Sequence, residues 1–163
     1  MRISAIEKYG LRCLLVLAKE GPDKQLSISE IAEREGLSIP YSSKLLAILR
    51  KAGLVVAERG RGGGFSITRE ASAITLFEVL TALGGPLVEP HHCSKYAGML
   101  QQCVHIDHCS VHDILDRLAD YVEQFLCETT LEDILKGKQI GFLTKSDYKF
   151  ILNTTNIENK LSG

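Results

Sequence analysis

A run of glycines in the first half of the chain restricts the fold more than any other feature. The run reads Arg59-Gly60-Arg61-Gly62-Gly63-Gly64, and glycine is a poor helix former. An apolar stretch, Leu54–Ala57, precedes the run, and Phe65–Thr68 alternates apolar and polar residues after it, which predicts two strands. A glycine loop that cradles a nucleotide phosphate would lead directly into a helix. The run therefore predicts a β-hairpin whose tip carries two arginines.

Three helices are predicted before this hairpin. The first spans roughly residues 4–19, where Ile6, Tyr9, Cys13 and Leu17 recur at helical spacing. Ser27 and Glu30 form a capping box for a short helix that ends before Gly36, and Ser38 caps another that runs through Lys51. Two short helices joined by a glycine turn are typical of a helix-turn-helix. With the hairpin as its wing, this part of the chain predicts a winged-helix fold.

The charges are divided between the two halves of the chain. Residues 38–69 carry six lysines and arginines against Glu58 alone, whereas residues 107–136 carry eight acidic residues against Arg117 and Lys136. This asymmetry favours contact between the basic part and a polyanion, although two differently solvated faces would give the same pattern. The predicted DNA-contacting residues are Ser38, Tyr41, Ser43, Lys44 and Arg50 on the second short helix, and Arg59 and Arg61 on the hairpin.

Cysteine and histidine are concentrated between residues 91 and 112. All five histidines and three of the five cysteines, Cys93, Cys103 and Cys109, lie in this segment. Thiolates and imidazoles are the ligands of iron–sulfur clusters, zinc and copper, so the segment predicts a metal centre. The alternative is a set of reduced, buried thiols beside solvated histidines. Cys13 lies on the apolar stripe of its helix and is interpreted as a core residue, and Cys127 as a residue without a role in the metal site.

A second amphipathic helix is predicted after this segment. Ser110 with Asp113 is expected to cap it, and an apolar seam follows at steps of three and four residues: Val111, Leu115, Leu118, Val122 and Phe125. A long helix with such a seam needs a partner, and a second copy of the chain related by a two-fold axis is the simplest one. Packing against its own domain is the alternative. A capped turn at residues 129–135 follows.

The chain as a whole is expected to be mainly α-helical with a small β-hairpin wing, combining a winged helix-turn-helix domain with a long dimerisation helix. The predicted divisions are 1–86 for DNA binding, 87–109 for the Cys/His loop, 110–136 for dimerisation, and an unassigned tail at 137–163. Five cysteines without a signal peptide indicate a reducing cytoplasm rather than a disulfide scaffold. The apolar run Leu11–Ala18 is too short to span a membrane.

Several of these segments resemble one known family. The opening Met1–Ser4, the segment Leu49–Val55 and above all the glycine run are similar to the Rrf-type winged-helix transcriptional regulators of the IscR and NsrR kind, and the resemblance extends from Met1 to about Lys136. It implies a homodimer that binds operator DNA and carries an iron–sulfur cluster in the loop before the dimer helix. It implies no small-molecule substrate and no membrane.

The resemblance also implies which residues hold the cluster. Cys93, Cys103 and Cys109 are the thiolate ligands, and IscR-like members take a fourth ligand from a histidine three residues after the last cysteine, which is His112 in this chain. His105, His108 and the partner's Glu7 are the rival fourth ligands. A 2Fe–2S cluster is favoured, with 4Fe–4S as the alternative.

The chain departs from the family pattern at three places. Nine residues separate Cys93 from Cys103, whereas known cluster-binding members often space these two cysteines more closely, so the resemblance does not fix the type of cluster. Lys8 and Arg12 stand where some members have a ligand for the partner's cluster, and neither cation can ligate iron. IscR-like members carry an acidic residue in the recognition helix at the position of Ser43, so the operator sequence need not be theirs.

Two other kinds of function compete with cluster control. A structural zinc site, or a cluster-free thiol redox switch, would leave the same DNA-binding fold with a different centre. An enzyme that uses a Cys/His pair, for example Cys103 with His105, would also need an orienting acid and a substrate pocket. The sequence indicates neither of these features, so the chain is not expected to be an enzyme.

Overall fold

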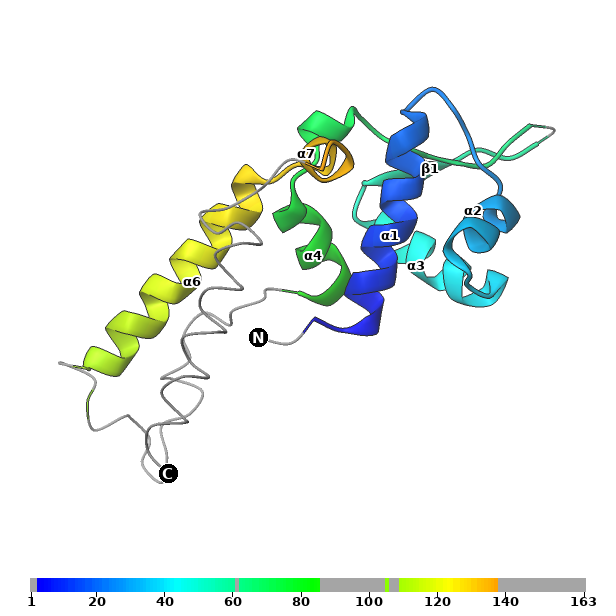
Figure 1. Cartoon of the computed structure of the whole chain (residues 1–163). Helices are drawn as coiled ribbons and strands as arrows, with labels where there is room; N and C mark the ends of the chain where they lie inside the picture. Colours follow the sequence, from blue (N-terminus) through cyan, green and yellow to red (C-terminus); the bar gives the residue numbers. More distant parts are fainter. Residues whose placement is uncertain (1–2, 61, 86–104, 106–108, 138–163) are drawn as a thin grey trace, which may run out of the picture.

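The computed structural model describes residues 3–60, 62–85, 105 and 109–137. A helical body carries a small hairpin on one side and a long helix on the other (Figure 1). The elements in chain order are α1 (Ala5–Glu20), α2 (Ile28–Glu35), α3 (Ile39–Lys51), β1 (Val55–Ala57), β2 (Phe65–Ile67), the 3-10 turn η1 (Ala71–Ala73), α4 (Leu76–Gly84), α6 (Ser110–Glu128) and α7 (Leu131–Leu135). The predicted fold class, mainly helical with a winged helix-turn-helix, is confirmed.

The predicted helix starts in the winged-helix part are confirmed by their caps. The Ser27 side chain accepts a hydrogen bond from the Glu30 amide at 3.2 Å while the Glu30 carboxylate accepts one from the Ser27 amide at 2.8 Å. Thr75 and Glu78 make the same reciprocal pair at the start of α4. Ser38 caps α3 by accepting from an amide in its first turn. Such caps satisfy amides that would otherwise be left unpaired at a helix start.

The predicted cap of the long helix is wrong by one residue. Ser110 is the first residue of α6, and Cys109 occupies the capping position in an extended conformation. The Sγ atom of Cys109 accepts a hydrogen bond from the backbone amide of His112 at 3.4 Å. A sulfur atom therefore takes the place that an oxygen fills at most helix starts. This brings Cys109 and His112 into one turn at the start of the helix.

The hydrophobic core forms around α1, which crosses the middle of the body. Leu14 and Leu17 are fully buried and pack against apolar residues of α2, α3, β2 and α4. The prediction that Cys13 is a core residue is confirmed, because its side chain is also fully buried. Burial raises the pKa of the Cys13 thiol to about 11, so this cysteine stays protonated and is unsuited to ligate a metal.

The hairpin is held to the body by a third stretch of backbone. Val55 pairs with Ile67 in the antiparallel β1–β2 ladder. Phe65 also pairs with Leu26, its amide donating to the Leu26 carbonyl at 2.8 Å and its carbonyl accepting at 2.9 Å. A Cβ atom on Gly64 would lie 2.5 Å from the Leu26 carbonyl oxygen. Glycine is therefore needed there for the close approach of two backbones.

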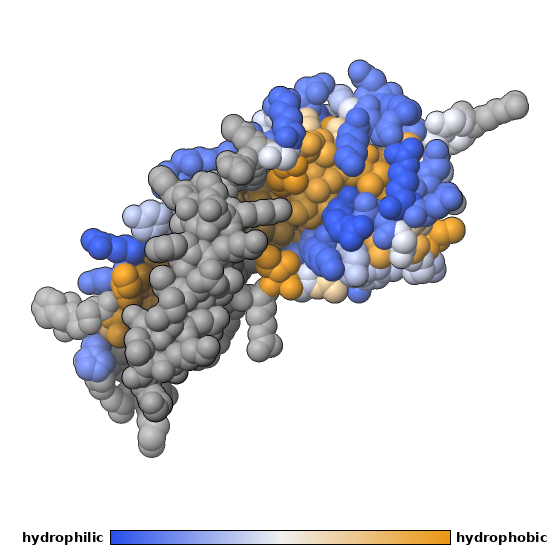
Figure 2. Space-filling view, in the orientation of Figure 1, coloured by the Kyte–Doolittle hydropathy of each residue, from blue (hydrophilic) through white to orange (hydrophobic). Residues whose placement is uncertain are grey.

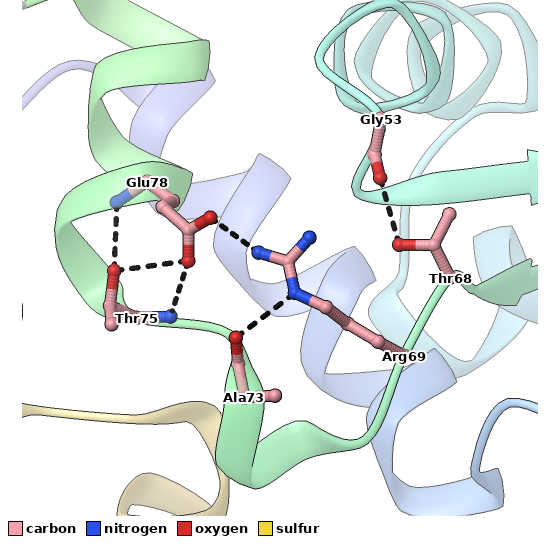
Figure 3. A network of polar contacts seen from close by, with 6 residues as sticks. All are labelled: Gly53, Thr68, Arg69, Ala73, Thr75 and Glu78. Atoms are coloured by element: carbon pink, nitrogen blue, oxygen red, sulfur yellow. Dashed lines mark hydrogen bonds and ion pairs between the residues drawn. The ribbon is translucent and has the colours of Figure 1, made fainter.

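A polar network fixes the end of the hairpin to α4 (Figure 3). The Arg69 guanidinium donates to the Ala73 carbonyl at 3.0 Å and forms an ion pair with Glu78. Burial acts to raise the pKa of Glu78, but hydrogen bonds from Thr75 and Arg69 outweigh it and lower the pKa. Arg69 is thus used inside the fold, although it belongs to the basic stretch of the sequence.

The long helix α6 extends away from the body, with α4 between it and α1 (Figure 1). Its carboxyl-terminal end is attached to the body: the Leu76 amide donates to the Thr129 carbonyl at 2.7 Å, and the Leu131 amide to the Ile74 carbonyl at 3.0 Å. The predicted capped turn exists, with Thr130 as the capping residue of α7. Within the described ranges, no helix is both long and apolar enough to cross a membrane.

Candidate functional site

One side of α3 packs on the core, and the other side is exposed to solvent. Leu45, Leu46 and Leu49 are fully buried and fix the helix on the body. The predicted DNA-contacting residues lie on the other side: Ser38, Ser43, Lys44 and Arg50 are exposed, and Tyr41 is half-buried. Four of these residues therefore lie on α3, and Ser38 is the residue that caps it. Small polar side chains at the start of a helix, with its amide dipoles behind them, suit contact with phosphates and base edges.

The charge of Lys8 on α1 extends this surface, whereas the guanidinium of Arg12 forms an ion pair with Glu35 of α2. The Tyr9 ring meets the Tyr41 ring edge-on, with 6.2 Å between centroids. Lys8 lies over the Tyr9 ring with its Nζ atom 4.9 Å from the centroid, and the Arg12 guanidinium carbon lies at 6.0 Å. In the sequence, Lys8 and Arg12 stand out only as the residues at the position of a metal ligand in some family members, and nothing in their local pattern indicates that Lys8 lies near the start of α3.

The hairpin carries the second group of predicted contacts. Arg59 is exposed two residues beyond the end of β1, and Gly60 and Gly62 adopt positive φ angles of 118° and 88°. Glycine adopts such angles freely, which permits the tight turn. The hairpin projects beyond the helices (Figure 1). Arg61 lies outside the described residues.

Two of the predicted metal ligands lie together at the start of α6. Cys109 is half-buried, and its Sγ atom bonds the His112 amide as described above. The His112 ring is 41% exposed, and its Nδ1 atom lies 2.8 Å from the Asp116 carboxylate one turn further along the helix. A thiol and an imidazole on one accessible turn are a donor pair that fits an iron–sulfur cluster or zinc.

The other predicted ligands have different outcomes. Cys93, Cys103 and His108 lie outside the described residues, and His105 is exposed. Among the residues that the structure describes, no three Cys, His, Asp or Glu side chains are placed to hold a metal ion. The full ligand set therefore stays a prediction.

Glu7 already has a structural role within its own helix. Its carboxylate accepts a hydrogen bond from the Ser4 amide at 2.6 Å and is buried beside Gly84. A Cβ atom on Gly84 would lie 2.6 Å from this carboxylate. For Glu7 to ligate a partner's cluster, the cap of α1 would have to open.

The free side of α6 is apolar and exposed. The residues concerned, called here the apolar face of α6, are Val111, Ile114, Leu115, Leu118, Tyr121 and Phe125, and each is at least 41% exposed. Figure 2 shows hydrophobic residues at the surface near the start of this helix. Among the α6 residues described, only Leu126 is buried, near the end of the helix that packs on α4. Packing among the residues that the structure describes therefore leaves most of the predicted seam uncovered.

The chain is similar to known transcriptional regulators over most of its length. The family model for Rrf2, described as "Iron-dependent Transcriptional regulator", matches residues 3–137. HTH-type transcriptional regulator IscR of Yersinia enterocolitica is 31% identical over 140 residues, which are 86% of this chain and 82% of that protein.

Two solved structures extend the comparison. T. potens IscR superposes with a TM-score of 0.65 at 29% identity, covering 91% of this chain and 96% of that one. CymR, the global cysteine regulator of B. subtilis, superposes with a TM-score of 0.64 at 30% identity, covering 85% and 99%.

Proposed function

The chain belongs to the Rrf2 family of transcriptional regulators, and on that premise we propose that it is a homodimer whose affinity for operator DNA is controlled by an iron–sulfur cluster. It is a DNA-binding regulator and not an enzyme. One observation carries the proposal of control: Cys109 and His112 share the first turn of α6, the helix that also exposes the apolar face. The same helix, α6, would then carry two of the metal ligands and the surface that joins the two protomers.

On the DNA side, α3 would enter the major groove. Ser43, Lys44 and Arg50 are exposed and would approach bases and phosphates, with Ser38 and Tyr41 at the start of the helix. Arg59 and Arg61 on the hairpin would reach the minor groove or the backbone. In the cytoplasm, where we place the protein, both groups of contacts would be available on each protomer of the dimer.

On the metal side, Cys93, Cys103, Cys109 and His112 would hold the cluster, 2Fe–2S being favoured over 4Fe–4S. When bound, a cluster supplies a group that oxidation, nitric oxide or iron scarcity can alter, and one imidazole ligand reduces its negative charge and raises its reduction potential. Because Cys109 and His112 lie at the start of α6, binding or loss of the cluster would change the conformation of the first turn of this helix. A shift in this helix would change the spacing of the two α3 helices and so bias two states of the dimer.

The first test is the metal itself. Protein purified without oxygen is expected to be coloured and to contain iron and acid-labile sulfide in near-equal amounts. A colourless protein with stoichiometric zinc would contradict cluster control while leaving the fold and the DNA-binding role intact.

A second candidate function is a cluster-free cysteine-dependent regulator. It is favoured by the likeness to CymR, a cysteine regulator that is 30% identical. Protein free of both iron and zinc that nevertheless changes its operator affinity on thiol oxidation would support this candidate.

A prediction for the DNA contacts concerns Arg59. Replacing Arg59 with alanine is expected to weaken operator binding and to reduce the slope of log affinity against log salt by about one, because one phosphate contact is lost. Titrations at several salt concentrations would measure both. Lys136→Ala is the matched control, since Lys136 is an exposed cation after α7, paired with Glu132. If both variants bind like the wild type, the hairpin is not a wing that meets DNA.

A further inference from the structure

His112 and Asp116 form a pair one helical turn apart, near the start of α6. The Nδ1 atom of His112 lies 2.8 Å from an Asp116 carboxylate oxygen, and the side chains are 41% and 65% exposed. The backbone amide of the same histidine is bound to the Cys109 Sγ atom. His112 is therefore bonded at its backbone amide to the predicted ligand Cys109 and at its ring to the carboxylate of Asp116.

From this arrangement we infer that Asp116 is a positioning residue for the metal site, which holds the His112 ring by Nδ1 and leaves Nε2 as the nitrogen that binds iron. The inference rests on the proposed function, because it assigns a task to Asp116 only if His112 is a ligand. It adds a residue that lies outside the Cys/His segment of the sequence.

The chemistry of histidine ligation supports this role. A neutral imidazole has one N–H group and one free nitrogen. A carboxylate next to Nδ1 favours the N–H at that atom, so the lone pair is on Nε2. Histidines that bind metals commonly donate their second ring N–H to a carboxylate or carbonyl, which fixes the ring's orientation and makes the ligating nitrogen more basic.

Helix stability alone does not account for the pair. An exposed pair at this spacing stabilises a helix only slightly. Asp113 already provides an acidic residue in the first turn of α6, where negative charge is favourable. The distinctive effect of Asp116 is therefore on the ring of His112.

The test compares the wild type with three variants of the full chain, all purified without oxygen. Asp116→Ala removes the carboxylate, Asp116→Glu keeps one within reach, and Asp120→Ala is the matched control, an equal change at an exposed acid one turn further along α6. The readouts are the visible and electron paramagnetic resonance spectra, the reduction potential, and the rate at which a chelator removes iron.

Asp116→Ala is expected to lose iron about ten times faster than the wild type, with altered spectra and a more positive reduction potential. Asp116→Glu is expected to restore most of the wild-type behaviour, and Asp120→Ala to match the wild type throughout. If the wild type holds a cluster and Asp116→Ala has the same spectra, reduction potential and rate of iron loss, Asp116 has no positioning role. The proposed function would still stand. Wild-type protein that holds no cluster would overturn both.

Discussion

Replacing Cys109 with alanine is expected to remove most of the visible absorbance of the anaerobically purified protein. A thiolate binds iron through its charge and softness, and no other described sulfur lies beside this position: Cys13 is buried in the core and Cys127 is near the far end of α6. The substitution also removes the cap of α6, which costs about 1 kcal/mol. That is small beside a typical stability of about 5–15 kcal/mol, so the fold should persist. Absorbance with iron and sulfide assays would measure the loss.

A pair of control variants separates ligation from capping. Cys109→Ser supplies an oxygen that can accept the His112 amide and so preserves the cap, yet it should lose the cluster as alanine does. Cys127→Ala changes an exposed cysteine outside the predicted site and should keep full colour.

The other predicted ligands complete the series of variants. Cys93→Ala and Cys103→Ala should also lose the colour, and His112→Ala should retain a less stable cluster. If Cys109→Ser and Cys109→Ala both keep the wild-type spectrum, Cys109 is not a ligand.

Replacing Leu118 with aspartate is expected to convert the proposed dimer to a monomer. Leu118 is 58% exposed at the middle of the apolar face of α6, so the change should leave the protomer folded. In a two-fold dimer it would place two carboxylates in an apolar interface. Burying unpaired charge costs on the order of 4 kcal/mol here, or roughly a thousandfold in the dimer dissociation constant. Sedimentation analysis would measure the change, and operator affinity should fall with it.

The control for this prediction adds the same charge elsewhere on the helix. Gln124→Asp changes an exposed residue of α6 that bonds Glu128 and is not part of the apolar face. It should remain dimeric, with the circular dichroism spectrum of both variants close to that of the wild type. A dimer of unchanged strength in Leu118→Asp would mean that another surface holds the two copies together.

Local sequence rules predicted most of the fold because they describe short-range physics. The caps at Ser27 and Ser38, the turn at Gly36 and the glycine hairpin each depend on residues a few positions apart. Pairings between distant segments left no such signal. The contact of Leu26 with Phe65, and that of residues 74–76 with 129–131, were found only in the structure.

The candidate site shows the same division. The exposed residues of α3 followed from helical periodicity, but Lys8 lies near them, through the contact of Tyr9 with Tyr41, only because α1 packs beside α3. The cap at Cys109 was missed because oxygen side chains are the usual capping groups, so Ser110 was the expected residue. The pairing of His112 with Asp116 has a recognisable spacing of four residues and could have been found from the sequence.

Operator titrations of a single preparation, before and after its cluster is removed without oxygen, test control by the cluster most directly. The duplex would come from selection among random sequences, and both titrations would use the same salt concentration. We expect the two affinities to differ by about fivefold or more, the usual lower range of coupling between two sites on one protein. Superimposable binding curves from the cluster-containing and the cluster-free protein would contradict control of operator binding by the cluster.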